Sequence, residues 1–467
     1  MASEIRANQI QSRTGVSTVS LTDTGPVISG VTTVQGTLTV DGGVTADVTG
    51  NVTGDITSSG TSTFDVISGV STIGVTTVHL TGINDLNYPT AGSLGHRNLI
   101  LNGGMKISAR GLTTSFTTSG SDDNYTLDRW EVGARVQSFE YTVTRESEGP
   151  VAIGSSHSAK LNIDAVTSES ASSNLVFQQK IEGQFLQHLK YGKSSAEPLA
   201  LSFYVKSNKT GTYGSQLLQY SGTGSSSYSA FREFTINTAD TWERKTLTFT
   251  GNTVSHIRNT STVGLAVQFH LHAGPDDQLA ASTATAANDW TTSGTLWKST
   301  TNQTNLADTI NNYIQFAGVQ LELGTRHTEF EITPYSTELS MCQRYYQIWK
   351  ASDPDFNGRD AATNSHGTSG NAYCTLLGNG SVHDSDDCHI SMSLPVEMRD
   401  APTATLTDAR VISGNSIYDN TTIIQINNSS RKRFSAFVDN EGAMTAKDAV
   451  SLVLKGSNAK LALDAEI

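Results

Sequence analysis

The chain is poor in charge and in cysteine, and it has no apolar run long enough to span a bilayer. Only 16% of its 467 residues are charged and the formal net charge is −13, so a nucleic acid or an anionic membrane surface is a disfavoured partner. Residues 1–6 carry no apolar signal-peptide core, so we expect synthesis in the cytosol and no membrane insertion. The three cysteines lack CxxC spacing and are expected to be buried free thiols: Cys342, Cys374 and Cys388.

Motifs of common catalytic sites are missing as well. There is no Gly-x-Ser-x-Gly, no His-Glu-x-x-His and no phosphate-cradling glycine loop. Three adjacent aspartate pairs could supply the two carboxylates of a glycosidase, which stand about 5 to 10 Å apart: Asp122 with Asp123, Asp276 with Asp277, and Asp386 with Asp387. Each pair has loop-forming neighbours, so solvated loops are the favoured interpretation. We predict that the protein is not an enzyme, with glycan cleavage as the alternative.

The first 95 residues instead contain a repeated pentad, with copies at 15–19, 30–34, 69–73 and 74–78. Its Val and Thr residues suit strands, and the recurrent Gly supplies turns. One copy buries too little to offset about 1–2 kcal/mol of backbone entropy per ordered residue. We therefore predict a stalk of short strands that folds by stacking or by winding around identical copies. A disordered linker is the alternative, which the regular Val spacing and scarce proline disfavour.

Residues 96–335 have the pattern of a β-sandwich. Apolar and other residues alternate along 199–205, 265–272 and 314–323, with the period of strands that bury one face. Gly318 interrupts the last of these and is interpreted as a bulge. Many such segments, separated by Ser, Gly and Asn loops, predict a central antiparallel sandwich of the jelly-roll type.

Residues 336–467 are predicted to form a third, β-rich domain that begins with one short helix. Ser336 is the expected helix cap, and an apolar stripe follows it at helical spacing: Leu339, Cys342, Tyr346 and Trp349. Asp353 and Pro354 are expected to end the helix. Beyond it, six segments have strand patterns: 373–377, 389–394, 403–406, 423–426, 434–438 and 450–454. We predict a C-terminal tip that resembles a β-sandwich.

The motifs of the two domains, in their order along the chain, resemble those of bacteriophage tail fibres. The segments that carry the resemblance to the carbohydrate-binding-module-like jelly roll of these fibres are 98–105, 109–111, 128–130, 202–213, 241–245 and 318–324. Segments 335–346, 394–403 and 464–467 are similar to the parts that follow it, and the repeat stalk resembles fibres of cyanobacterial podoviruses. The aromatic residue that often precedes the Arg-Gly pair is replaced by the segment 107–109.

This resemblance implies an all-β homotrimeric fibre located on the virion. Residues 1–95 would form the virion-attachment arm and stalk, docked on a tail adaptor or nozzle protein, although the larger attachment domain of many podoviral fibres is missing. Residues 96–335 would form the jelly roll, and residues 336–467 the tip that binds a host surface glycan such as lipopolysaccharide. The alternative function is a glycan depolymerase.

Sugar recognition requires aromatic faces beside carboxylates, amides or hydroxyls. In the C-terminal domain the candidate receptor-binding residues are Tyr373, Tyr418, Phe356, Asp386, Asp387, Asn415 and Asn420, with Trp349 as a further ring. A second sugar site could use tryptophans of the central domain: Trp130, Trp242, Trp290 and Trp297. Of these, Trp130 and Trp242 lie in motifs that favour a structural role.

A loop rich in His and Asp is the candidate metal site. His383, Asp384 and His389 are the candidate ligands, with Asp386 and Asp387 between them. Oxygen ligands favour a hard divalent cation and His favours zinc; an exposed polar loop is the alternative. We expect no cofactor other than such a cation. Two further histidines, 270 and 272, share a strand face and are expected at the surface.

Overall fold

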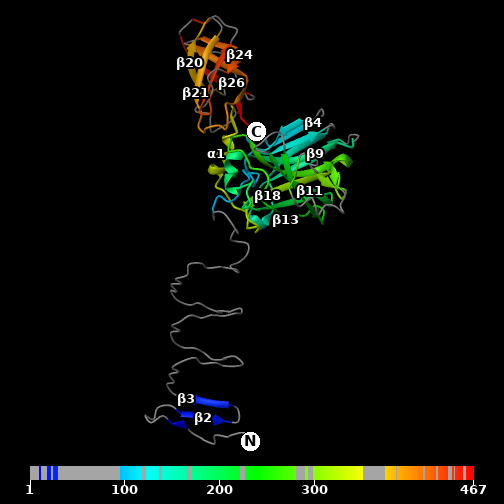
Figure 1. Cartoon of the computed structure of the whole chain (residues 1–467). Coiled ribbons are helices and arrows are strands. Elements are labelled where there is room, and N and C mark those ends of the chain that lie inside the picture. The colour runs from blue at the N-terminus through cyan, green and yellow to red at the C-terminus, as the bar shows by residue number, and fades with distance from the viewer. Residues whose placement is uncertain are drawn as a thin grey trace. The chain divides into compact units, whose positions relative to one another are not determined.

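The fold was obtained as a computed structural model (Figure 1). It describes residues 10–11, 18–22, 25–29, 95–117, 122–135, 139–165, 170–220, 227–279, 290–292, 298–350, 374–384, 387–413, 416–426, 430–439, 444–445, 448–455 and 459–467. Contacts divide the chain into two compact units, 1–78 and 79–467, each of which is described by itself. None of the described helices is both long and apolar enough to cross a membrane.

The described part of the first unit is a three-stranded antiparallel sheet. Its strands are β1 (Ile10–Gln11), β2 (Thr18–Thr22) and β3 (Gly25–Ser29), in that order. Strand β2 includes the end of the first pentad, as predicted. The other pentads lie outside the described residues, so the repeat stalk stays a prediction.

The second unit contains the predicted antiparallel β-sandwich. One sheet has the order β13 (Glu243–Phe249), β10 (Leu199–Ser207), β18 (Tyr313–Leu323), β8 (Ser158–Ala165), β7 (Glu140–Glu146) and β4 (Thr113–Thr117). The other has the order β16 (Thr291–Thr292), β12 (Ser227–Ile236), β11 (Gly211–Tyr220), β14 (Val263–Ala273), β9 (Asn174–Glu182), β6 (Glu131–Arg135) and β5 (Asp122–Tyr125). Short elements complete it: β15 (Gln278–Leu279) with β17 (Ser299–Thr300), and the 3-10 helices η1 (Val151–Ile153), η2 (Gly183–Leu189), η3 (Pro275–Asp277) and η6 (Leu306–Asp308).

Aromatic rings join the two sheets across the core. Phe203 and Phe316 come from the six-stranded sheet, and their ring centroids lie 4.8 Å and 4.7 Å from that of Phe269 in the seven-stranded sheet. All three rings are buried. The alternating apolar residues along 199–205 and 265–272 face this core, which confirms the sandwich inferred from their period.

The predicted bulge at Gly318 is also confirmed. The register of β18 against β10 shifts between Ser202 and Tyr204, and Gly318 lies opposite this step with φ of +58°. A Cβ at this position would lie 2.4 Å from Ile153 Cδ1. Glycine is therefore required both by the left-handed backbone and by the close approach of η1.

The C-terminal strands form a closed barrel instead of the predicted sandwich-like tip. The barrel order is β20 (Cys374–Val382), β21 (Asp387–Ser393), β25 (Arg433–Asp439), β24 (Ser416–Ile426), β23 (Ala409–Ser413) and β26 (Ala449–Lys455). A separate three-stranded sheet contains β19 (Tyr346–Lys350), β27 (Lys460–Asp464) and β22 (Thr403–Thr407). Strand periodicity alone does not distinguish the two architectures, because closure depends on pairing between β20 and β26, which are far apart in sequence.

The helix is shorter than predicted. Helix α1 (Tyr335–Gln343) begins after Pro334, and no side chain caps it, so Ser336 is not the cap. Cys342 is buried as expected, but Tyr346 lies on β19. The predicted helical stripe is wrong beyond α1 because its last two aromatic residues pair with β27 as a strand, opposite Asp464 and Leu461. Tertiary pairing outweighs local helical spacing here.

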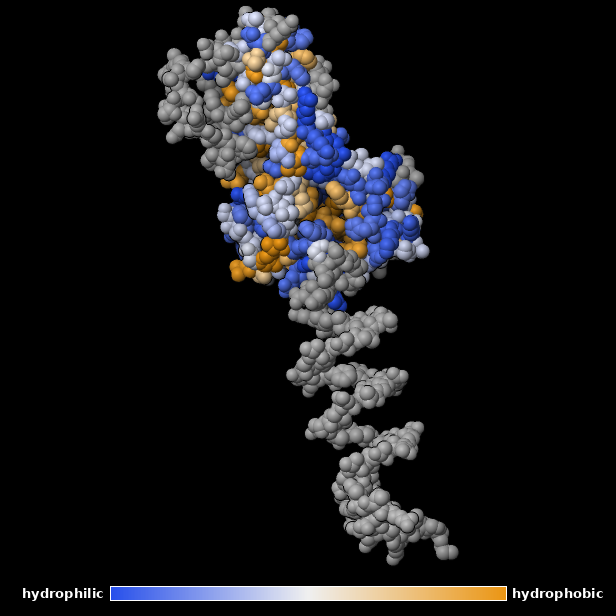
Figure 2. All heavy atoms as spheres, turned by 90° about the vertical axis from the view of Figure 1, so that its left-hand side faces the viewer, coloured by the Kyte–Doolittle hydropathy of each residue, from blue (hydrophilic) through white to orange (hydrophobic). Residues whose placement is uncertain are grey.

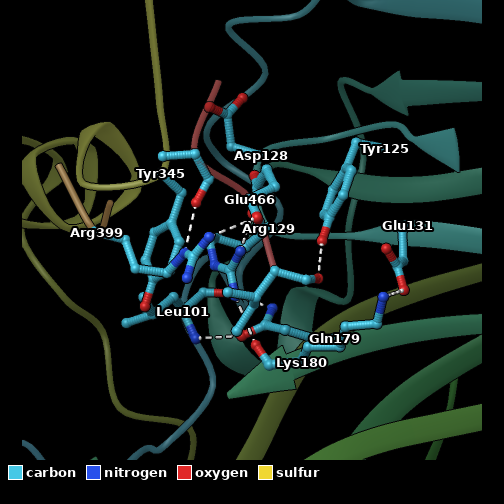
Figure 3. A network of polar contacts seen from close by, with 12 residues as sticks. Leu101, Tyr125, Asp128, Arg129, Glu131, Gln179, Lys180, Tyr345, Arg399 and Glu466 are labelled. Atoms are coloured by element: carbon cyan, nitrogen blue, oxygen red, sulfur yellow. Dashed lines mark hydrogen bonds and ion pairs between the residues drawn. The ribbon is translucent and has the colours of Figure 1, made fainter. Parts of the chain in front are cut away.

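The last residues of the chain dock against the sandwich. Arg129, which is fully buried, forms an ion pair with Glu466 and lies 3.6 Å from the ring centroid of Tyr345 (Figure 3). Arg110 pairs with Asp464 at 2.9 Å, and the Tyr125 hydroxyl donates to the carbonyl of residue 467. The second unit is thus closed by contacts between its first and last segments.

Candidate functional site

The structure describes only three of the seven receptor-binding residues predicted in the C-terminal domain. Four of them, Phe356, Tyr373, Asp386 and Asn415, lie outside the described residues. Tyr418 and Asn420 lie on β24, and Asp387 begins β21, which is two strands away across β25. This set stays a prediction.

Two of the candidate metal ligands, His383 and Asp384, contact each other, and the third, His389, contacts a serine. His389 Nε2 lies 2.7 Å from Ser435 Oγ, and His383 Nδ1 lies 3.2 Å from Asp384 Oδ2. Among the described residues no three His, Cys, Asp or Glu side chains gather as a metal site would require. Cys342 and Cys388 are buried free thiols, as predicted.

The three described tryptophans of the central domain each have a different partner. Trp130 is fully buried and stacks on Phe177 at 4.7 Å, which confirms its structural role. Trp290 packs against Tyr191, and Trp242 lies under the Lys206 ammonium at 5.3 Å. Trp297 lies outside the described residues.

A row of amide side chains crosses the outer face of the seven-stranded sheet. Gln216 on β11, Gln268 on β14, Gln178 on β9 and Glu131 on β6 lie directly opposite one another in register. Gln268 Nε2 donates to Gln178 Oε1, and Gln178 Nε2 donates to Glu131 Oε1 at 2.6 Å. Lys180 continues the network, with its Nζ 2.8 Å from Glu131 Oε1 (Figure 3). We call this set the amide row.

A groove of about 440 Å³ lies over the amide row. On one side of the amide row, His270 pairs with Gly214 and Val176. Ala266 lies on the other side of the row. Gly133 lies opposite Val176, and a Cβ there would stand 2.9 Å from Asp123 Oδ1. The groove is therefore floored by amides, while Leu218 and Tyr220 supply apolar and aromatic surface in its wall.

Every cation that lines the groove is paired with a carboxylate. On β5 and β6, Arg135 Nη1 lies 2.7 Å from Asp123 Oδ1. Asp277 is the other carboxylate in the lining, and its Oδ2 lies 2.7 Å from Lys298 Nζ. Asp123 and Asp277 are members of two of the predicted aspartate pairs, and the structure places both in this groove with cationic partners.

The two strand histidines are buried, contrary to the surface position expected for them. His270 is 1% exposed and His272 is 3% exposed. The expectation was wrong because β14 lies between β9 and β11 and further segments cover it: Gln303 Nε2 donates to the His270 carbonyl at 3.0 Å, and His272 Nε2 lies 2.9 Å from Ser173 Oγ. Burial, and to a lesser degree the charge of Lys298, lowers the pKa of His270 to about 3.

This burial predicts an acid sensitivity of folding. The folded pKa of His270 lies below its ordinary value of 6.5, so the unfolded chain binds the proton first and stability falls as the pH drops below about 6.5. When the pH is lowered from 6.5 to 4.5, the unfolding free energy of both proteins should fall. The fall should be about 2–3 kcal/mol smaller in the His270→Gln variant than in the unmodified protein. Denaturant unfolding at both pH values measures this difference. His383→Gln, at a 62% exposed site, is the control, and an equal acid loss in His270→Gln would contradict the assignment.

Sequence reasoning missed the amide row, although a signal for it was present. Gln178, Gln216 and Gln268 each occupy the non-core position of a strand whose other face is apolar. All three are buried, and buried glutamines are uncommon, so their occurrence on three apolar strands is a signal that the sequence carries. Their adjacency could not be predicted, because it depends on the strand order β11, β14, β9.

A second cavity of about 550 Å³ lies beside α1 and η2. Figure 2, which views the side on which α1 lies in Figure 1, shows hydrophobic surface gathered in a hollow between hydrophilic residues. The lining of the cavity is mainly apolar, and its three arginines already pair within the chain: Arg97 with Glu322, Arg129 with Glu466 and Arg344 with Glu182. The amide-floored groove is the better candidate, since its floor presents hydrogen-bonding groups.

Comparison with known proteins gives only distant similarities. No protein-family model and no curated protein matches the chain. The enzymatically active domain of bacteriophage CBA120 tailspike protein 4 is 13% identical with a TM-score of 0.27; the match covers 48% of this chain and 21%, about a fifth, of that one. A family 11 carbohydrate-binding module from Clostridium thermocellum is 11% identical (46% and 97% covered, TM-score 0.23). The CBM22-2 xylan-binding domain from Paenibacillus barcinonensis Xyn10C is 15% identical (44% and 98% covered, TM-score 0.24). None of these is close enough in sequence or superposition to assign a family.

Proposed function

We propose that the protein is a glycan-binding protein and that the groove over the amide row is its binding site. The amide row carries the proposal. Glutamine amides offer both donors and acceptors, which is what the hydroxyl groups of a sugar require. Tyr220 supplies an aromatic surface for the apolar face of a pyranose ring. The floor of the groove is held by hydrogen bonds between side chains of neighbouring strands.

The setting that we propose for this binding is a phage tail fibre. The order of the motifs in residues 98–467 and the repeat stalk before them support it. In this proposal three copies assemble through the stalk, the N-terminal arm attaches to a tail adaptor or nozzle protein, and the virion is held at a host surface glycan such as lipopolysaccharide. Three grooves on one fibre would convert weak single-site contacts into useful avidity through high effective concentration. The C-terminal tip would add contacts of its own.

The groove is tested by removing one ring and one amide together. In the full-length protein, the double variant Tyr220→Ala with Gln268→Ala should bind a recognised polysaccharide about ten- to a hundredfold more weakly, because a stacking face and a hydrogen-bonding amide are lost. Isothermal titration against purified host surface polysaccharide measures the affinity. Recovery of the polymer at its original length is expected, since both aspartates of the groove are held in ion pairs.

The matched control is Thr113→Ala, at an exposed position of β4 in the other sheet. It should leave the affinity unchanged. Unaltered binding by the double variant would remove the groove from the proposal, and release of short oligosaccharides would favour the depolymerase alternative. Circular dichroism and denaturant unfolding of all variants separate lost binding from lost folding.

A further inference from the structure

We propose that the groove selects an uncharged stretch of glycan and discriminates against repeat units that carry carboxylate or phosphate groups. This inference rests on the proposed glycan-binding function and deepens it, because it names the class of ligand. It is carried by the charges of the groove, by their pairing, and by the state of the one histidine in its lining.

The charges in and directly beneath the groove sum to zero. Its three cations are Arg135, Lys180 and Lys298, and their carboxylate partners are Asp123, Glu131 and Asp277. A site built for an anion would leave at least one cation for the ligand. Here an anionic sugar must either displace a carboxylate from its cation or lie beside the carboxylate as a like charge.

The floor between these ion pairs is neutral. Gln178, Gln216 and Gln268 supply dipoles without charge. His270 lies in the next row, with its Nε2 3.3 Å from Gln216 Oε1. Because that oxygen is an acceptor, the proton of the neutral ring is assigned to Nε2 and the lone pair to Nδ1, which has no hydrogen-bond partner among the described residues. Burial disfavours the charged form of this ring, so the wall contains a neutral imidazole where an anion site would place an imidazolium.

The test compares each polysaccharide with its own oxidised form. Full-length protein is titrated with a neutral glucan, galactan and mannan, and with the same three polymers after oxidation of C6 to the carboxylate. At least one neutral polymer should bind, and its oxidised form should bind at least tenfold more weakly. The affinity for the neutral polymer should change less than twofold between low and high salt, since no net charge is neutralised on binding.

A variant that removes one carboxylate from the groove tests the role of the ion pairs in this selectivity. Asp277→Asn leaves Lys298 without its carboxylate, so the ratio of the affinity for the oxidised polymer to the affinity for its neutral parent should rise severalfold. Asp400→Asn is the control, because this 63% exposed carboxylate lies away from the groove beside Arg399 and gives the same change of net charge. An oxidised polymer bound as tightly as its neutral parent by the unmodified protein, with binding that weakens in salt, would overturn the selectivity and leave the glycan function standing. Failure of all six polymers to bind would overturn the glycan function itself.

Discussion

Replacing Glu466 by glutamine should destabilise the second unit by about 3–5 kcal/mol, because the substitution leaves the buried charge of Arg129 without its counterion. Arg129 is 1% exposed and the Glu466 side chain 4% exposed, so water cannot take over the pairing. Burial alone would lower the pKa of Arg129, but the Glu466 carboxylate raises it above its ordinary value. The guanidinium therefore stays charged and must be paired. Denaturant unfolding, followed by circular dichroism, measures the loss.

Two further variants identify the cause of this loss. The double variant Arg129→Met with Glu466→Leu removes both charges and should recover most of the stability, since apolar side chains of similar size can replace a buried pair. Asp400→Asn removes a carboxylate from an exposed pair with Arg399 and should change the unfolding free energy by less than about 1 kcal/mol. If Glu466→Gln were as mild as Asp400→Asn, the docking of the last residues would not stabilise the unit.

Strands with alternating apolar residues could be predicted because their signal is local. Segments 199–205, 265–272 and 314–323 each lie on a strand of the sandwich, and each of the six segments predicted after residue 372 overlaps a strand in its described residues. Their apolar faces meet in the core as the period requires. The bulge at Gly318 was also local, since a glycine inside a strand pattern commonly marks a bulge or a close backbone approach.

Features that depend on distant partners could not be predicted in this way. The strand β19 was interpreted as the end of a helix because its partner β27 lies more than a hundred residues downstream. Closure of the barrel likewise depends on β26 pairing with both β20 and β23. The amide row follows the same rule, because Gln178, Gln216 and Gln268 become neighbours only through the strand order of the sheet. A site built from side chains on several strands can be predicted only when the order and register of those strands are known.

Trp130 and Trp242, the two tryptophans in motifs that favour a structural role, differ in how deeply they are buried. Trp130 is fully buried, stacks on Phe177 with an interplanar angle of 6°, and its Nε1 donates to the Asn102 carbonyl at 3.1 Å. Trp130→Ala should therefore cost about 3–5 kcal/mol of unfolding free energy, through the cavity it creates and the hydrogen bond that it removes. Denaturant unfolding of the full-length protein measures this cost.

Trp242→Ala is the matched control for Trp130→Ala. Trp242 is only partly buried, and its ring is capped by the Lys206 ammonium at 5.3 Å. An interaction of this kind contributes about 0.5–1 kcal/mol at exposed sites, so the control should lose far less stability than Trp130→Ala. Equal losses would mean that the sandwich core does not depend on the stack of Trp130 and Phe177. Sugar binding is not an alternative role for Trp130, because its ring is fully buried.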